Sequence, residues 1–440
     1  MIVKDSWRLL PATTAAFVAT AAFAKSFVPF YLIGSTPIFA ATCFFGVLLV
    51  MLAGRKLAEQ TTYVTDIFLA LALFYCAIIA SFLVNSLHRV PVTHLLGILI
   101  FHGLFLVFGF AAARALKAVF VVLLVQATIY ILVIAQHAVR VGDPMRHGYL
   151  NDIFGVGSPA ISITFHQTIG TALGLATLAF IALAARRTRL LAFVALPLVF
   201  LFLFHIAART AMVALACSLL FWGGAALWTR SKKLAIAGIT TVIAIAMAAS
   251  LVFYQLALRD KAVDTVAPDA ISRTIREIQD PRPMFRVQIW ARTINHIVTE
   301  PERSLLGRGI GVYPIDEGFG PPNWLLKPAE GNKYYPHNIY LEALYEAGLA
   351  GLLPFLALTL LPLCISLGRW NKYGTADQAA ILLYVFYFVA MHISGSFAFS
   401  YDFQFFLGLS IGVVALSRKQ DRGVPGVPIE LRPTGTPRQA

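Results

Sequence analysis

Twelve apolar stretches dominate this chain of 440 residues, and each is about as long as a bilayer is thick. A helix needs about 20 apolar residues to cross the hydrocarbon core of a membrane. The chain is 59% hydrophobic and only 13% charged, so lipid must take the place of water around much of it. The sequence therefore predicts an all-α polytopic membrane protein, with spans near residues 9–25, 36–53, 64–84, 92–113, 117–138, 161–184, 190–207, 210–228, 234–256, 339–366, 378–396 and 401–417.

Basic residues follow every even-numbered span: Arg55 and Lys56, Arg114 and Lys117, Arg186 to Arg189, Arg230 to Lys233, Arg369 and Lys372, and Arg418 to Arg422. Because Lys and Arg accumulate in cytoplasmic loops, both termini are expected on the cytoplasmic side. The net charge of +14 reports this asymmetry and does not imply nucleic acid as a partner. The first apolar run follows Lys4 and Arg8 without a cleavage signal and is expected to be a retained span.

The predicted organisation has four parts. Residues 1–256 hold spans one to nine, residues 257–338 form a large external loop, residues 339–417 hold the last three spans, and residues 418–440 form a disordered tail rich in Pro and Gly. Within the loop, Met284 to Val298 is predicted to be a short amphipathic helix and Gly307 to Gly311 a turn.

Candidate catalytic residues gather where the loop meets the tenth span. The loop contains eight arginines and ends in Tyr335-Pro336-His337-Asn338. Histidine moves protons near neutral pH, and Asn338 suits the N-cap of the following helix. The alternative is that His337 is only a capping or interfacial side chain.

Arginine side chains are the candidate phosphate ligands, because the planar guanidinium binds phosphate in a bidentate manner. Arg282 and Arg286 lie four residues apart, so on a helix they would share one face and address one diphosphate. Arg209 lies between two apolar runs at the predicted outer face, where a charge is costly unless it is paired or used. The alternatives are a solvated loop surface for the first two and snorkelling for Arg209.

Acidic residues follow His337 on the same helix. Glu342 and Glu346 are expected to favour the helix dipole, to pair with the arginines, or to orient His337. Three further polar residues are predicted near the outer face in structural roles: His166, His392 and Asp402. Asp316-Glu317 is the single adjacent acidic pair, and no Asp-x-Asp or His-Glu-x-x-His motif occurs. The four cysteines lie inside apolar runs, so no metal site is expected from them. The sequence has no nucleotide-binding glycine motif placed after a strand, so no cofactor is expected either.

Three segments resemble the O-antigen ligase and polymerase superfamily of bacterial envelope glycosyltransferases. They are Ala208-Arg209-Thr210-Ala211, then Phe285-Arg286 through Trp290 to Pro301 with Leu306 to Gly311, and Pro336-His337-Asn338-Ile339-Tyr340-Leu341-Glu342 with Gly348-Leu349-Ala350-Gly351. The last segment, which opens a span after a large loop, carries the likeness furthest. Ala208 departs from the family pattern, in which serine is frequent.

The resemblance implies a GT-C-like fold in the inner membrane and a metal-independent, inverting transfer from an undecaprenyl-diphosphate-linked glycan. It implies that Arg209 and Arg286 hold the diphosphate and that His337 activates the acceptor hydroxyl. Arg282 is added to the diphosphate ligands because of its spacing from Arg286, and Glu342, Asn338 and Tyr335 are expected in support. The acceptor of a ligase is the lipid A-core oligosaccharide, and membrane lipids surround the protein. The size and single large loop favour the ligase over the polymerase and the protein-glycosylating branch. A secondary transporter and a scaffold are the alternatives from other classes.

Overall fold

The computed structural model describes residues 6–26, 36–141, 159–184, 186–205, 208–259, 275, 279, 286–322, 335–398 and 400–422. Within these ranges all regular secondary structure is helical. The longer helices are α1 (Ser6–Ser26), α2 (Thr36–Thr61), α3 (Thr65–Ser81), α4 (Val92–Ala112), α5 (Leu116–Val141), α7 (Pro159–Leu183), α8 (Arg186–His205), α9 (Arg209–Arg230), α10 (Lys232–Arg259), α12 (Arg286–Thr299), α14 (Ile339–Gly368), α15 (Thr375–Ser394) and α16 (Tyr401–Asp421). Short helices are η1 (Phe82–Ser86), a π-helical turn that continues α3, η3 (Pro301–Arg303) and α13 (Tyr313–Asp316).

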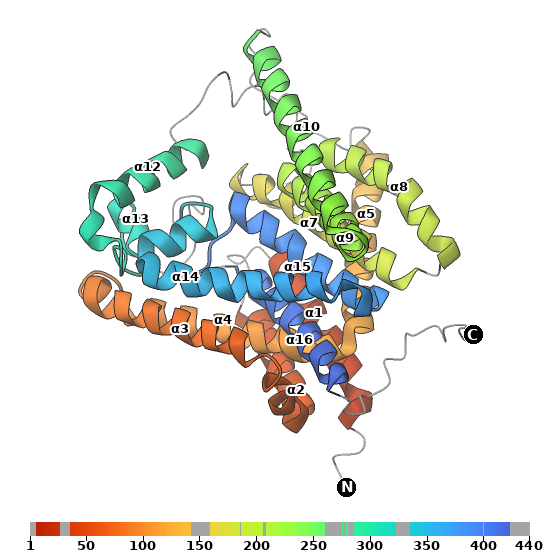
Figure 1. Ribbon diagram of the computed structural model, residues 1–440, viewed down its shortest axis with the longest axis horizontal. Helices are drawn as coiled ribbons and strands as arrows, with labels where there is room; N and C mark the ends of the chain where they lie inside the picture. Colours follow the sequence, from red (N-terminus) through yellow and green to blue (C-terminus); the bar gives the residue numbers. More distant parts are fainter. Residues whose placement is uncertain are drawn as a thin grey trace.

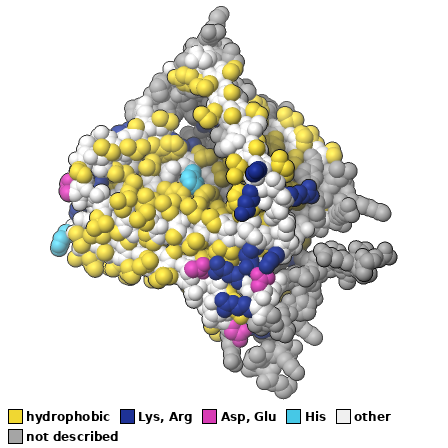
Figure 2. Space-filling model, in the orientation of Figure 1, with side chains coloured by type: hydrophobic (Ala, Val, Ile, Leu, Met, Phe, Trp, Pro, Cys, Tyr) yellow, Lys and Arg dark blue, Asp and Glu magenta, His cyan; other side chains and the backbone are white. Residues whose placement is uncertain are grey.

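Each predicted apolar segment is overlapped by one of these helices. Five helical segments are long and apolar enough to cross a membrane: Thr65–Ser86, Val92–Leu132, Arg209–Arg230, Ile339–Gly368 and Thr375–Ser394. Large apolar side chains remain exposed over α3 and α14, which form a broad hydrophobic face (Figure 2). The described part of the chain is thus all-helical with five candidate membrane spans, as predicted, while the number of twelve spans stays a prediction.

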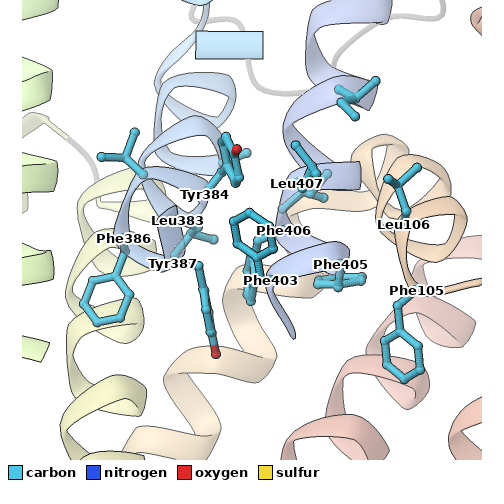
Figure 3. Packing of buried hydrophobic residues seen from close by; sticks show 14 of the residues in the cluster. Phe105, Leu106, Leu383, Tyr384, Phe386, Tyr387, Phe403, Phe405, Phe406 and Leu407 are labelled. Carbon is cyan, nitrogen blue, oxygen red and sulfur yellow. The ribbon is translucent and has the colours of Figure 1, made fainter. Parts of the chain in front are cut away.

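Pairs of helices distant in sequence form the bundle. In Figure 1, α14 lies along α3, and contacts join α16 to α4 and α15 to α9. The crossing of α4 and α16 depends on glycine: a Cβ on Gly109 would lie 1.8 Å from the carbonyl oxygen of Phe405. Close approach through small residues is how helices commonly pack in membranes. Aromatic side chains of α15 and α16 fill the adjacent core, where the rings of Tyr387 and Phe406 stack at 4.8 Å (Figure 3).

Hydrogen bonds and ion pairs connect the ends of several predicted even-numbered spans at one end of the bundle. Arg114 donates to Gln60 at 2.9 Å, and Arg418 pairs with Asp66 at 3.0 Å. Arg369 also pairs with Asp421, so the exits of the second, fourth, tenth and twelfth predicted spans meet there. This is the grouping that the charge alternation predicts; which side of the membrane it faces stays a prediction.

Helix α16 extends past residue 418, where the disordered tail was predicted to begin. The division of the chain into four parts stays a prediction. Helix α16 continues to Asp421, because Arg418 and Lys419 pair with acidic groups of the α2–α3 region, Asp66 and Glu59. Residues 423–440 lie outside the described part of the chain.

Candidate active site

The predicted helix cap beside His337 is confirmed. The Asn338 side-chain oxygen accepts hydrogen bonds from the backbone N–H groups of Tyr340 and Leu341, at 3.0 Å and 3.1 Å. Its amide nitrogen donates to the backbone carbonyl of His392 at 3.1 Å. One side chain thus satisfies two free amides at the start of α14 and ties that start to the end of α15.

His337 itself has a left-handed backbone conformation, with φ of 58°, and its side chain is buried. It is the one non-glycine residue in the described ranges with a positive φ. This conformation costs an L-residue about 1–2 kcal/mol, so the surroundings must hold it in place. The Trp290 indole donates to the Pro336 carbonyl at 2.9 Å, and the Tyr335 ring lies 4.6 Å from the imidazole. These contacts fix the imidazole at the entrance of α14.

Tyr335, which is in ring contact with His337, is also influenced by Glu342 and Arg286. Burial raises the pKa of Tyr335 to about 12; the Glu342 carboxyl adds to the rise and the Arg286 guanidinium opposes it. At neutral pH the phenol stays protonated and is available as a hydrogen-bond donor.

Arg286 is the first residue of α12, the helix predicted over Met284 to Val298. Its Nη2 atom donates to the hydroxyl of Ser394, the last residue of α15, at 3.3 Å. Ser394 and Tyr335 both line the same cavity. The structure thus brings the second and third resemblance segments to one place, although 50 residues separate Arg286 from Pro336 in the sequence.

A cavity of about 390 Å³ lies among α1, α4, α5, α7, α9, α15 and α16. One set of lining residues is apolar, including Phe17, Phe105, Leu123, Phe405 and Phe406, and another is polar, including Gln126, Gln167, Thr171, Thr210, Ser394, Ser400 and Asp402. Arg209 begins α9 between Ala208 and Thr210, which both line the cavity. Apolar walls with convergent polar groups are typical of a ligand site.

Glu342 forms hydrogen bonds with groups that the sequence does not predict. We expected it to pair with an arginine or to orient His337, but its carboxylate accepts from the Ser396 hydroxyl at 2.7 Å and from the Phe397 backbone N–H at 2.6 Å. The side chain is fully buried. These bonds anchor the turn between α15 and α16, which also carries cavity residues. Glu342 therefore links the helix that follows His337 to the wall of the cavity.

Helix α14 is broken at Gly348, where φ is 63°. The loop after η3 supplies the hydrogen bonds that the break removes: Leu349 and Ala350 donate to the carbonyls of Ser304 and Leu305, at 2.8 Å and 3.0 Å. In return the backbone of Gly309 donates to the carbonyl of Glu346 at 3.1 Å. Backbone hydrogen bonds thus connect the loop around Gly307 to Gly311 with the glycine-rich end of the third segment.

The remaining described arginines of the loop form ion pairs away from the cavity. Arg308 pairs with Asp316 at 2.9 Å and also with Glu300, and Arg292 pairs with Glu317 at 3.2 Å. The adjacent acids Asp316 and Glu317 therefore serve as counter-ions. In the described part of the chain, no three His, Cys, Asp or Glu side chains are placed to hold a metal ion.

The predicted site residues are thus distributed unequally. His337, Asn338, Tyr335 and Arg286 come together beside the cavity, and Arg209 lies at its edge. Arg282 lies outside the described residues, and so does the side chain of His166. Ser394 and Ser396 were not predicted, and Asp402 was expected to be structural. Single residues at helix ends and turns, distant in sequence from the other site residues, form no recognisable motif. His392 contributes its backbone carbonyl to Asn338.

Part of the chain matches a known protein family. Residues 194–356 match the family model Wzy_C, described as O-antigen ligase. The resemblance to the O-antigen ligase and polymerase superfamily is thereby confirmed over this segment. The matched segment contains Arg209, Arg286 and His337. No curated protein matches the chain. Ser394 at the end of α15 and Asp402 at the start of α16 lie beyond the matched residues.

Proposed function

We propose that the protein is a glycosyltransferase that transfers a glycan from undecaprenyl diphosphate to the lipid A-core oligosaccharide, at the outer face of the bacterial inner membrane. One observation carries the proposal: Arg286, Tyr335 and the Arg209 region converge on a cavity with both polar and apolar walls. His337 lies in ring contact with Tyr335 at this place. Cations, a proton acceptor and a mixed cavity are what a lipid-linked donor requires.

In the proposed reaction the acceptor hydroxyl attacks the anomeric carbon of the donor sugar. The new bond joins the acceptor oxygen to this carbon, and the bond from the carbon to the diphosphate oxygen breaks. His337 takes the proton of the hydroxyl as the new bond forms, and a positioned base contributes about 10²–10⁴-fold. The departing diphosphate carries negative charge, which Arg286, Arg209 and Arg282 stabilise. Direct displacement inverts the anomeric centre.

A reconstituted assay tests this function. The purified protein is placed in liposomes with lipid-diphosphate glycan and lipid A-core, without ATP and with EDTA. We expect covalent conjugate to form, because the arginines and not a divalent metal meet the charge of the leaving group. Inhibition by EDTA that Mg²⁺ reverses would contradict this. Glycan movement driven by an ion gradient, without covalent transfer, would favour a transporter.

The product distinguishes the branches of the superfamily. A ligase attaches the whole polymer to the core, whereas a polymerase lengthens the lipid-linked chain. In cells without the protein, a ligase defect leaves polymer on the lipid carrier and a bare core. Single repeats on the core would instead show a polymerase, and loss of glycan from proteins would show the protein-glycosylating branch.

A further inference from the structure

Helix α12 has three kinds of surface around its circumference. The first sector is buried in the protein, where Ile289 and Thr293 are 3% and 0% exposed and Ile289 packs with Tyr313 and Tyr345. The second sector is polar and consists of Gln288, Arg292, Asn295 and Thr299. The third sector is apolar but exposed, and consists of Val287, Ala291, Ile294 and Val298.

The exposed sector, which we call the α12 stripe, is a continuous line along the helix. Its members follow one another at offsets of four, three and four residues, so they lie on one face. Val287 is 72% exposed, Ile294 is 48% exposed and Val298 is 70% exposed. A helix face in water normally carries charged and polar residues, but the α12 stripe has no Lys, Arg, Asp or Glu.

The α12 stripe leads to the hydrophobic face of the bundle. After α12 and η3 the chain reaches Leu305, which is 64% exposed and whose carbonyl accepts from Ala350 of α14 at 3.0 Å. The neighbouring α14 residues Leu349 and Leu353 are 42% and 61% exposed, and they belong to a segment that is apolar enough to span a membrane. Figure 2 shows hydrophobic side chains over α3 and α14 and also over the region of α12.

We propose that α12 lies along the membrane interface, with the α12 stripe inserted among the acyl chains of the bilayer lipids. The three sectors then match three surroundings, since one faces protein, one faces lipid and one faces water. Amphipathic helices at membrane surfaces bury their apolar face to a similar shallow depth. The proposal concerns lipid contact alone and does not depend on the proposed reaction. If that function also holds, α12 keeps Arg286 at the depth of lipid phosphates.

Spin-label accessibility in single-protein nanodiscs tests the proposal. The full chain, with Cys43, Cys76, Cys217 and Cys364 replaced by alanine, receives one cysteine at a time. The variants Ile294→Cys and Val298→Cys report the stripe, Asn295→Cys is the matched neighbour on the polar sector, and Leu353→Cys is the lipid reference. Each carries a nitroxide. Collisions are measured with oxygen, which concentrates in lipid, and with a water-soluble nickel chelate.

We expect the ratio of oxygen to nickel collisions at positions 294 and 298 to exceed that at Asn295 several-fold and to lie on the lipid side, toward the value at Leu353. A water-like ratio at 294 and 298 would overturn the proposal, because the stripe would then be solvated. Protection from both reagents would also overturn it, because another part of the chain, such as residues 260–285, would then cover the stripe. Protection that appears only with two proteins per disc would assign the surface to a second copy instead.

Discussion

At the scale of single residues, His337 combines a strained backbone with an imidazole in ring contact with Tyr335, which lines the cavity. Asparagine tolerates the left-handed conformation better than most residues but has no group that takes up a proton. His337→Asn should therefore keep the fold and reduce transfer by about 10²–10⁴-fold, the usual contribution of a positioned base. The measurements are initial transfer rate and thermal unfolding in detergent, with exposed His88→Asn as the control.

Turnover in His337→Asn close to that of the unchanged protein would remove the imidazole from the mechanism. His337→Ala should lose transfer as well, but it also places alanine at φ of 58°. A larger loss of stability in the alanine variant than in the asparagine variant would measure the backbone contribution separately.

Arg286 is predicted to act through the geometry of its guanidinium as well as its charge. Lysine keeps the charge but loses the planar pair of donors. Arg286→Lys should therefore weaken stabilisation of the diphosphate by about 1.5–3 kcal/mol, or roughly 10- to 100-fold in rate. Arg303→Lys is the matched control, because Arg303 is half-exposed and pairs with Glu300 at 2.8 Å. Equal rates in both variants would show that charge alone suffices at position 286.

Local residue roles could be predicted from the sequence, and long-range ones could not. The Asn338 cap is set by its immediate neighbours, so the residue type and position were sufficient. The partners of Glu342 lie on the turn at Ser396 and Phe397, which only the packing of α14 against α15 and α16 brings near. The left-handed backbone of His337 also has no sequence signal beyond the residue type.

At the scale of elements, the break in α14 depends on glycine. A Cβ at Gly348 would lie 2.4 Å from the carbonyl oxygen of Leu305, and the residue has φ of 63°. Gly348→Ala should lower the free energy of unfolding by at least about 1–2 kcal/mol, the cost of the left-handed conformation alone. Chemical unfolding in detergent measures the change. Gly223→Ala is the control, because no atom lies within 4 Å of a Cβ there, and an equal effect in both variants would contradict the account.

The ion cluster beside this break gives a pH dependence. Burial would raise the pKa of Asp316, but hydrogen bonds from Arg89, Arg308 and Tyr345 outweigh it and hold the pKa below its ordinary value. A folded-state pKa below the unfolded value means that the stabilisation is present at neutral pH. It is lost as the pH falls through the folded-state pKa, below about 4.

Asp316→Asn should therefore melt at a lower temperature than the unchanged protein near neutral pH, and the difference should shrink below about pH 4. Melting temperature as a function of pH in detergent checks this. Glu300, whose pKa is lowered first by its hydrogen bond to Arg308, keeps part of the acid dependence in the variant. A difference in melting temperature that stays constant with pH would show that Asp316 contributes nothing by ionisation.

The existence of the helices was predictable, because long apolar runs must satisfy their backbone groups internally in lipid. The break at Gly348 was not, since a glycine within an apolar run also occurs in unbroken helices. Gly307 to Gly311 was predicted to be a turn. Its attachment to α14 depends on residues that are distant in sequence, such as Arg308, whose backbone N–H donates to the carbonyl of Tyr345 at 2.7 Å.

At the scale of the whole molecule, the candidate site is assembled from distant parts of the chain. The cavity is lined by residues of α1, α4, α5, α7, α9, α15 and α16, and charge patterns along the sequence contain no information about its shape. The sequence did predict that the motifs at Arg209, Arg286 and His337 belong to one site. It did so through a family resemblance, and the match over residues 194–356 supports that resemblance.

The arginine variants should be impaired in binding of the diphosphate, and the histidine variant should be impaired in transfer of the glycan. Binding of undecaprenyl diphosphate to the protein in nanodiscs is measured for the unchanged chain and for three variants. We predict that Arg209→Ala and Arg286→Ala each weaken binding at least tenfold, whereas His337→Asn binds normally but transfers glycan about 10²–10⁴-fold more slowly. Normal diphosphate binding by both arginine variants would contradict the central claim that fixed guanidinium groups hold the leaving group.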